Sequence, residues 1–198
     1  MPCTVCVRTS IGRLAILLGV LVVPAWSAPA PRVYGPQRTL PAARDAVPAS
    51  ATIAVGTSAP KLDLPGRDGK PVTLAEFAGK VVYVYFWSSW TPTCQQDLPV
   101  LNGLQARYAA QGLQILGVGV DLHREDADSF LDDHPAEFVL AFDASSKAPR
   151  DYGVVAMPAG VLIGRDGRVL QVLGGVKVDR QAELESSIQA ALKAPATR

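Results

Sequence analysis

Residues 81–94 read VVYVYFWSSWTPTC, and this stretch decides how the chain folds. Its first six residues are β-branched or aromatic without a polar break, which is typical of a strand buried on both faces. After the turn, the apolar residues Leu98, Leu101, Leu104 and Tyr108 recur at helical spacing, and Gly112 follows, a residue that commonly ends helices. The stretch therefore predicts a central strand, a tight turn and a helix, with Cys94 in the first helical turn.

The position of Cys94 predicts a reactive sulfur. A thiol in the first turn of a helix lies near unpaired backbone N–H groups and the positive end of the helix dipole, and both favour the thiolate. We also expect Thr91, three residues earlier, to donate a hydrogen bond that lowers the pKa of Cys94. The alternative is an inert cysteine packed behind the strand, because cysteine is often a small buried side chain.

The rest of the chain alternates predicted strands and helices. Residues 59–73 predict a small hairpin, because they hold the turn-forming pairs Pro-Gly and Asp-Gly. Further strands are predicted at 114–120, 138–141, 161–164 and 169–172, and helical segments at 74–77, 125–131, 146–152 and 179–192. This order predicts an α/β fold with a central mixed sheet and helices on both faces. Sites in such sheets lie at the carboxyl ends of strands, which is where Cys94 stands.

The N-terminus predicts export. Residues 1–27 have a basic start, an apolar run over 14–23 and small residues before a cleavage site after Ser27, which is the layout of a secretory signal peptide. Residues 28–55 are rich in proline and alanine and predict an extended linker. The domain itself is then expected over residues 56–195. We predict a periplasmic or otherwise exported protein, which contacts a membrane only if the N-terminal signal stays uncleaved.

Composition narrows the range of partners. Nineteen basic and eighteen acidic residues give a formal net charge of +1, so the sequence predicts no nucleic-acid partner. Two of the three cysteines, Cys3 and Cys6, lie in the predicted signal peptide, so the mature protein would hold Cys94 alone and no internal disulfide. His123 and His134 stand near aspartates and are interpreted as solvated surface residues. We therefore expect no metal and no cofactor.

The segment around the turn resembles a known active site. Phe86-Trp87, a second tryptophan at Trp90, Pro92 two residues before the cysteine, and a following helix that contains proline are similar to the active-site segment of the TlpA/ResA-like thioredoxin family. The likeness continues through Met157-Pro158, which leads into the apolar run at 161–163. It implies a thioredoxin-like fold with an N-terminal β-hairpin extension. Members of this family are exported thiol–disulfide oxidoreductases.

The resemblance also implies roles for the residues of the turn. The position of Thr91 corresponds to the exposed nucleophilic cysteine of the family, and Cys94 corresponds to the resolving cysteine. A threonine hydroxyl cannot carry a mixed disulfide, so the usual cycle of two cysteines does not run in this chain alone. We therefore predict a redox protein that acts through Cys94 on the thiols or disulfides of other exported proteins.

The Thr-x-x-Cys pattern over residues 91–94 leaves a second function open. It is similar to the motif of peroxiredoxins, which share the thioredoxin fold and whose cysteine attacks peroxide. Such chemistry needs a thiolate, a hydroxyl group and a guanidinium group. The arginine of peroxiredoxins would be expected near Pro158, and residues 155–160 contain none. Only half of a one-cysteine peroxidase site is therefore present.

A third function needs no chemistry at Cys94. In the family, the dipeptide at Met157-Pro158 is cis, faces the turn and offers backbone hydrogen bonds to an extended substrate. The resemblance therefore implies a peptide-binding surface made by Trp90, Pro92, Met157 and Pro158. Of the two tryptophans that flank the turn, we expect Trp87 in the core and Trp90 in solvent. Such a surface would bind partner proteins even in a redox-inactive module.

Overall fold

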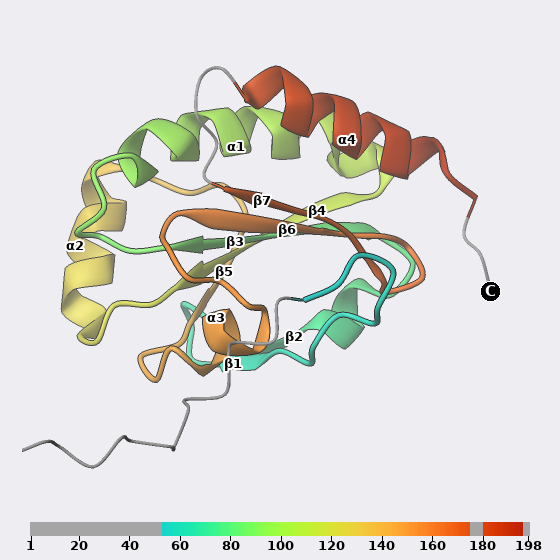
Figure 1. Ribbon diagram of the computed structural model, residues 1–198. Helices are drawn as coiled ribbons and strands as arrows, with labels where there is room; N and C mark the ends of the chain where they lie inside the picture. Colours follow the sequence, from blue (N-terminus) through green and yellow to red (C-terminus); the bar gives the residue numbers. More distant parts are fainter. Residues whose placement is uncertain (1–52, 175–179, 196–198) are drawn as a thin grey trace, which may run out of the picture. The chain divides into compact units, whose positions relative to one another are not determined.

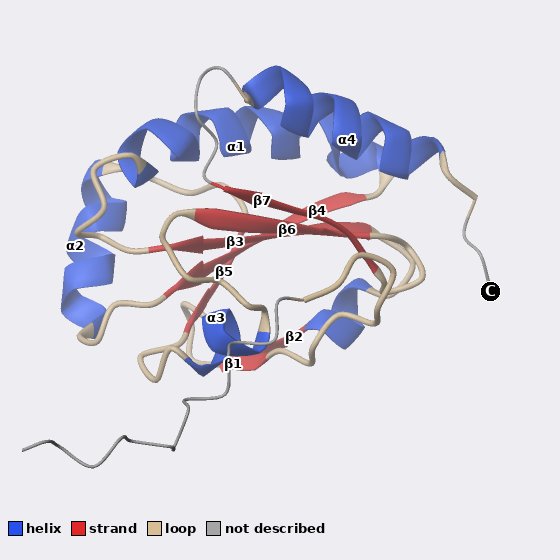
Figure 2. Ribbon diagram, in the orientation of Figure 1, coloured by secondary structure: helices blue, strands red, loops and turns tan. Residues whose placement is uncertain are grey.

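The computed structural model describes residues 53–174 and 180–195. The predicted signal peptide and nearly all of the predicted linker lie outside these residues, and so does the predicted start of the last helix at Asp179. The described part forms an α/β domain around one central sheet (Figures 1 and 2). Within the described ranges, every helix is too short or too polar to span a bilayer.

The central sheet has five strands in the order β5-β4-β3-β6-β7. These strands are Val81–Trp87 (β3), Leu113–Gly119 (β4), Val139–Phe142 (β5), Ala159–Ile163 (β6) and Val169–Gly174 (β7). β3 pairs in parallel with β4 and antiparallel with β6, while β4 pairs in parallel with β5. A separate hairpin joins Asp63–Pro65 (β1) to Pro71–Thr73 (β2). The predicted mixed sheet, central strand and N-terminal hairpin are confirmed.

Helices cover both faces of the sheet, as predicted. Figure 1 shows α1 and α4 side by side above the sheet and α3 below it, near the β1–β2 hairpin. The helical segments are Leu74–Phe77 (η1), Cys94–Tyr108 (α1), Ala109–Gln111 (η2), Arg124–Asp133 (α2), Lys147–Asp151 (α3) and Gln181–Lys193 (α4), of which η1 and η2 are 3-10 helices. Gly112 follows η2 with φ of 98°, a conformation that glycine adopts without strain. This glycine ends the helical segment where the sequence predicts.

The side chains of β3 alternate between two apolar clusters, because successive residues of a strand point to opposite faces. One cluster holds Tyr83, Tyr85 and Trp87 together with residues of α1, α2 and α4. The other holds Val84 and Phe86 together with residues of η1 and α3. Every residue of β3 is buried. The strand is therefore held from both sides, and it gives the turn that follows it a rigid base.

Candidate active site

The turn after β3 lies at the carboxyl end of the central strand. β3 ends at Trp87 and α1 begins at Cys94. Two backbone hydrogen bonds shape the turn between them, from the Thr91 N–H to the Ser88 carbonyl at 3.3 Å and from the Cys94 N–H to the Thr91 carbonyl at 3.0 Å. Cys94 follows this turn as the first residue of α1 and is fully buried.

A buried aspartate from the neighbouring strand holds the turn in place. Asp121 follows β4 and is 5% exposed. Its carboxylate accepts hydrogen bonds from the Ser89 N–H at 3.1 and 3.2 Å and from the Ser89 hydroxyl group. The two residues meet because the carboxyl ends of parallel strands lie at the same edge of the sheet. The sequence offers one signal for this role, an aspartate soon after a buried parallel strand.

The environment of Cys94 favours the thiol over the thiolate. Burial raises the pKa of the Cys94 thiol, and the negative charges of Asp97 and Asp121 raise it further. Hydrogen bonds from the Ser88 backbone and the Tyr85 hydroxyl lower that pKa, but burial outweighs them. The predicted lowering of the Cys94 pKa is therefore wrong, because the start of a helix does not replace the water lost around a fully buried sulfur.

A tyrosine and an aspartate form a polar pair behind Cys94. The Tyr85 hydroxyl on β3 donates a hydrogen bond to the Asp97 carboxylate on α1 at 2.8 Å. Tyr85 is fully buried and Asp97 is 2% exposed, and burial raises the pKa of Tyr85. Asp97 comes three residues after Cys94, so the two side chains share a face of the helix. That spacing is the signal by which the sequence could have placed Asp97 in the site.

The hydroxyl of Thr91 pairs with Ser88 instead of with Cys94. The two hydroxyl oxygens lie 2.7 Å apart. Ser88 is fully buried and Thr91 is half-buried, so this pair closes the base of the turn. The hydrogen bonds that lower the Cys94 pKa come from Tyr85 and from the Ser88 backbone. The predicted role of Thr91 as a donor to sulfur is therefore wrong.

The predicted binding residues lie around the same turn. The Met157-Pro158 peptide bond is cis, as the family resemblance implies. It directly precedes β6, whose Ala159 pairs with Phe86 near the end of β3, so the dipeptide lies beside the turn. Met157 and Pro158 are half-buried. The resemblance implies a peptide-binding surface made by Trp90, Pro92, Met157 and Pro158, and we name this set the docking surface.

Further exposed apolar side chains lie in the loops that follow β4 and precede β6. Trp90 is 62% exposed, Leu122 in the loop after β4 is 70% exposed, and Val155 in the loop before β6 is 88% exposed. Pro92 is exposed as well, whereas Trp87 is fully buried. The predicted positions of the two tryptophans are confirmed. Sequence reasoning missed Leu122 and Val155, because a single apolar residue in a loop forms no pattern.

His134 and Arg124, at the two ends of α2, have partners of their own. The His134 ring packs on Phe130 with a centroid distance of 4.9 Å. Arg124 donates to the Asp128 carboxylate at 3.0 Å and lies over the Phe142 ring at 3.5 Å. In the described part of the chain, no three His, Cys, Asp or Glu residues are grouped as metal ligands would be. These contacts support the packing of α2, and they add nothing to the peroxidase alternative.

The fold and this site define a thioredoxin-like protein. The redoxin family model matches residues 54–192, and the chain belongs to the redoxin family. The thiol-disulfide oxidoreductase ResA of Bacillus thuringiensis subsp. konkukian is 30% identical over 129 residues, which cover 65% of this chain and 75% of the relative. The ResA of Geobacillus thermodenitrificans is 31% identical over 136 residues, which cover 68% and 78% of the two chains.

Solved structures agree with this assignment. A crystal structure described as a thiol:disulfide interchange protein DsbE, from Chlorobium tepidum, is 43% identical with a TM-score of 0.69 and covers 71% of this chain and 99% of its own. The thioredoxin domain of a Bacteroides vulgatus thiol-disulfide oxidoreductase, at 23% identity and a TM-score of 0.62, covers 69% and 99% and shows the fold alone. The TlpA/ResA-like family and the thioredoxin-like fold are confirmed, and the chain is of the thiol–disulfide oxidoreductase type.

Proposed function

We propose that this chain is an exported redox protein that binds partner proteins on the docking surface and exchanges disulfides through Cys94 alone. The observation that carries the proposal is the position of Cys94 at the start of α1, after the turn that follows the end of β3, where Phe86 pairs with Ala159 next to the cis Met157-Pro158 bond. Thr91 stands where the family has its other cysteine. The redoxin relatives support the chemistry, and the predicted signal peptide over residues 1–27 supports export.

The exchange uses one thiol of this chain and a disulfide of the partner. The Cys94 thiolate attacks one sulfur of the partner disulfide, forms a mixed disulfide and releases the other partner sulfur as a thiolate. A partner thiolate then attacks the mixed disulfide, forms a new partner disulfide and restores the Cys94 thiolate. The partner's disulfide is rearranged, and this chain is neither oxidised nor reduced overall. Thr91 takes no part in these covalent steps.

Burial sets the conditions for this exchange. Cys94 is fully buried and its pKa is raised by burial, so the reactive thiolate is scarce at neutral pH. The turn must open before a disulfide reaches the sulfur. We therefore propose a slow exchange whose rate increases as the pH rises, because the thiolate is the nucleophile.

Formation of a mixed disulfide tests this proposal. The full chain carries Cys3→Ser and Cys6→Ser, so that Cys94 is its only thiol, and reacts with glutathione disulfide between about pH 7 and about pH 10. Mass spectrometry of the digested protein should find glutathione on the Cys94 peptide, at a rate that rises with pH, and none after Cys94→Ser. Absence of the adduct from the folded protein over this whole range would overturn the proposal.

The complete burial of Cys94 favours a second function, a redox-inactive module that binds extended protein segments without covalent chemistry. The exposed indole of Trp90 and the cis Pro158 would make the contacts. Reduced, carboxymethylated α-lactalbumin is a suitable probe, because it is unfolded and has no free thiol. Binding that persists in Cys94→Ser and is lost in Trp90→Ala would select this function, and absence of binding to the unchanged chain would exclude it.

A further inference from the structure

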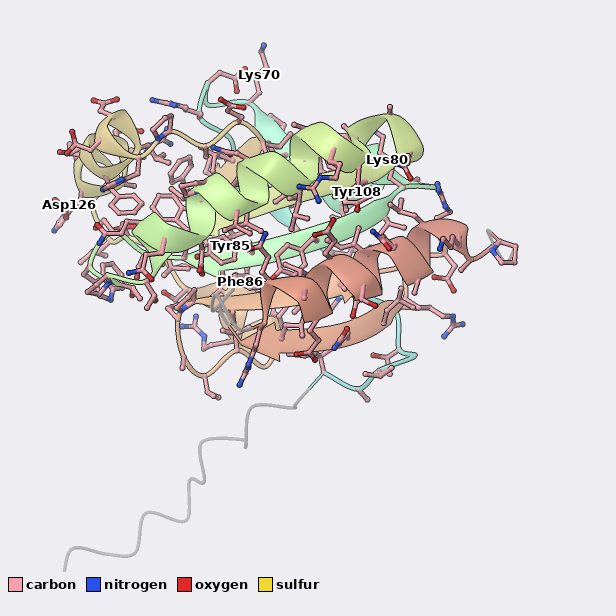
Figure 3. All side chains as sticks on the ribbon, turned by 90° about the horizontal axis from the view of Figure 1, so that it is seen from above. Lys70, Lys80, Tyr85, Phe86, Tyr108 and Asp126 are labelled. Carbon is pink, nitrogen blue, oxygen red and sulfur yellow. The ribbon has the colours of Figure 1, made fainter. Side chains whose placement is uncertain are left out.

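A groove of about 310 Å³ lies at the opposite end of β3 from Cys94. Its walls come from residues 59–61, from η1 and the loop up to Lys80, and from the turn between β6 and β7. Figure 3 shows Lys80 and Tyr85 toward opposite ends of the sheet. The groove is therefore separate from the site around Cys94.

The floor of this groove is apolar. It includes Leu74, Phe77, Val82 and Ile163. Phe77, Val82 and Ile163 belong to the buried core, and Leu74 packs against it. The volume is at the lower end of the range of about 300 to 1,000 Å³ that is typical of small-molecule sites. A floor of this kind suits an alkyl chain, which loses contact with water on binding.

The rim of the groove is positively charged. Lys61 and Lys80 are exposed, and both line the groove. In the described part of the chain, neither lysine forms an ion pair with a carboxylate. Asp166, the acidic residue of the rim, lies 3.8 Å from the Arg168 guanidinium. The rim therefore has two cations available for a ligand.

Arg165 adds a third positive charge, and its position is defined. Its guanidinium donates hydrogen bonds to the carbonyls of Gly79 at 2.9 Å, Gln111 at 3.0 Å and Leu192 at 3.4 Å. Carbonyl oxygens satisfy the donors but carry no full negative charge, so the charge of Arg165 is not neutralised by these contacts. The positive potential at the groove thus comes partly from a side chain that the fold holds in place.

We propose that this groove binds a small amphiphilic carboxylate, with its alkyl chain on the floor and its carboxylate toward Lys61 and Lys80. A small hydrophilic anion has no alkyl chain to bury on the apolar floor, so the floor would not contribute to its binding. The cationic rim excludes an amphiphile with a positive head group. The site is independent of the redox function proposed for Cys94.

Three probes separate the contributions that the alkyl chain and the head-group charge make to binding. Dodecanoate carries both features, butyrate carries the charge with a short chain, and dodecyltrimethylammonium carries the same long chain with the opposite charge. Calorimetric titration of the full chain should show saturable binding of dodecanoate, weaker by roughly tenfold or more for the other two probes. Equal binding of dodecyltrimethylammonium would overturn the proposal, and so would the absence of dodecanoate binding.

Charge-reversal variants test whether dodecanoate binds in this groove. The double variant Lys61→Glu with Lys80→Glu should weaken dodecanoate binding by roughly tenfold or more, whereas Lys70→Glu, an exposed lysine that does not line the groove, should leave it unchanged. Circular dichroism checks that each variant is folded. An equal loss in both would contradict the proposal. Binding to phosphatidylglycerol vesicles without binding to dodecanoate would assign the cations to a membrane surface and would also contradict it.

Discussion

Tyr85 and Asp97 are joined by a 2.8 Å hydrogen bond in the space behind Cys94, and this bond links the central strand to the helix that carries the thiol. The hydroxyl of Tyr85 also contacts the sulfur, where it stabilises the thiolate. One donor thus serves two acceptors that compete for it. The negative charge of Asp97 raises the pKa of Cys94. The hydrogen bond from Tyr85 to Asp97 also raises that pKa, because it draws the Tyr85 donor away from the sulfur.

Removal of the Asp97 charge should make Cys94 more reactive. In Asp97→Asn the pKa of Cys94 should fall, because a charge that raises it is lost. The rate of iodoacetamide alkylation at mildly alkaline pH should therefore rise several-fold. Mass spectrometry of the Cys94 peptide reads this rate without interference from the other two cysteines.

The variant Tyr85→Phe should change the rate of Cys94 alkylation in the opposite direction. It removes a hydrogen bond that lowers the Cys94 pKa, so alkylation at the same pH should become slower. The ring and its packing are retained. Faster alkylation in both variants would indicate a general loosening of the core, and the proposed competition would then be wrong.

The raised pKa of Cys94 predicts a loss of stability at alkaline pH. An unfolded cysteine ionises near about pH 8.5, while the folded protein keeps its proton to a higher pH because Cys94 is buried. Between these two pKa values the folded state binds more protons than the unfolded state, so the free energy of unfolding falls as the pH rises. Below about pH 8.5 this contribution is fully present.

Urea unfolding between about pH 7 and about pH 10 measures this effect. The free energy of unfolding of the unchanged chain should decrease across the upper half of that range, and the decrease should be smaller in Cys94→Ala. The tyrosines with raised pKa values change the free energy of unfolding only above about pH 10, the ordinary pKa of a tyrosine. Parallel curves for the two proteins would show that Cys94 is not the group responsible.

Two buried tyrosines should respond in opposite ways to the same substitution. Among the residues that the structure describes, the Tyr83 hydroxyl has no hydrogen-bond partner, so Tyr83→Phe should stabilise the protein by roughly 1 kcal/mol. The Tyr152 hydroxyl donates to the Pro60 carbonyl at 2.7 Å, so Tyr152→Phe should destabilise it by roughly 1 kcal/mol. Both residues are fully buried, so the changes in the free energy of unfolding by urea can be compared directly between the two variants.

A cysteine introduced at Thr91, where the resemblance implies the family's other cysteine, should create a dithiol site. Thr91 lies three residues before Cys94 at the start of α1, so Thr91→Cys should form a disulfide with Cys94 and catalyse the reduction of insulin by dithiothreitol. The double variant Thr91→Cys with Cys94→Ser is the control, since it has the exposed thiol without its resolving partner. No gain over this control would show that the surrounding site no longer supports the two-cysteine cycle.

The fold could be predicted from the sequence because its signals are local. Every residue of β3 is apolar or aromatic, and residues 88–94 carry the distinctive order of tryptophan, proline and cysteine. Trp87 and Trp90 could be assigned to core and solvent for the same reason. Each of these predictions depends on neighbours within a few positions of the chain.

The electrostatics of the site could not be predicted in this way. Whether Cys94 keeps contact with water depends on side chains of β3, β4 and α1 that pack around it only in the folded protein. The contact between Ser89 and Asp121 joins residues 32 positions apart. A helix start is visible in the sequence and favours the thiolate, whereas the desolvation that opposes it is a property of the assembled core.

Thr91 carries a hydroxyl group at a position where the resemblance implies a cysteine, and this hydroxyl pairs with that of Ser88. Two cysteines change their bonding when their surroundings become oxidising or reducing, and the loop that carries them changes with it. Hydroxyl groups undergo no such change. The bonding of residues 88 and 91 is therefore the same at every ambient redox potential, and under the proposed function Cys94 is the residue of this segment whose bonding responds to it.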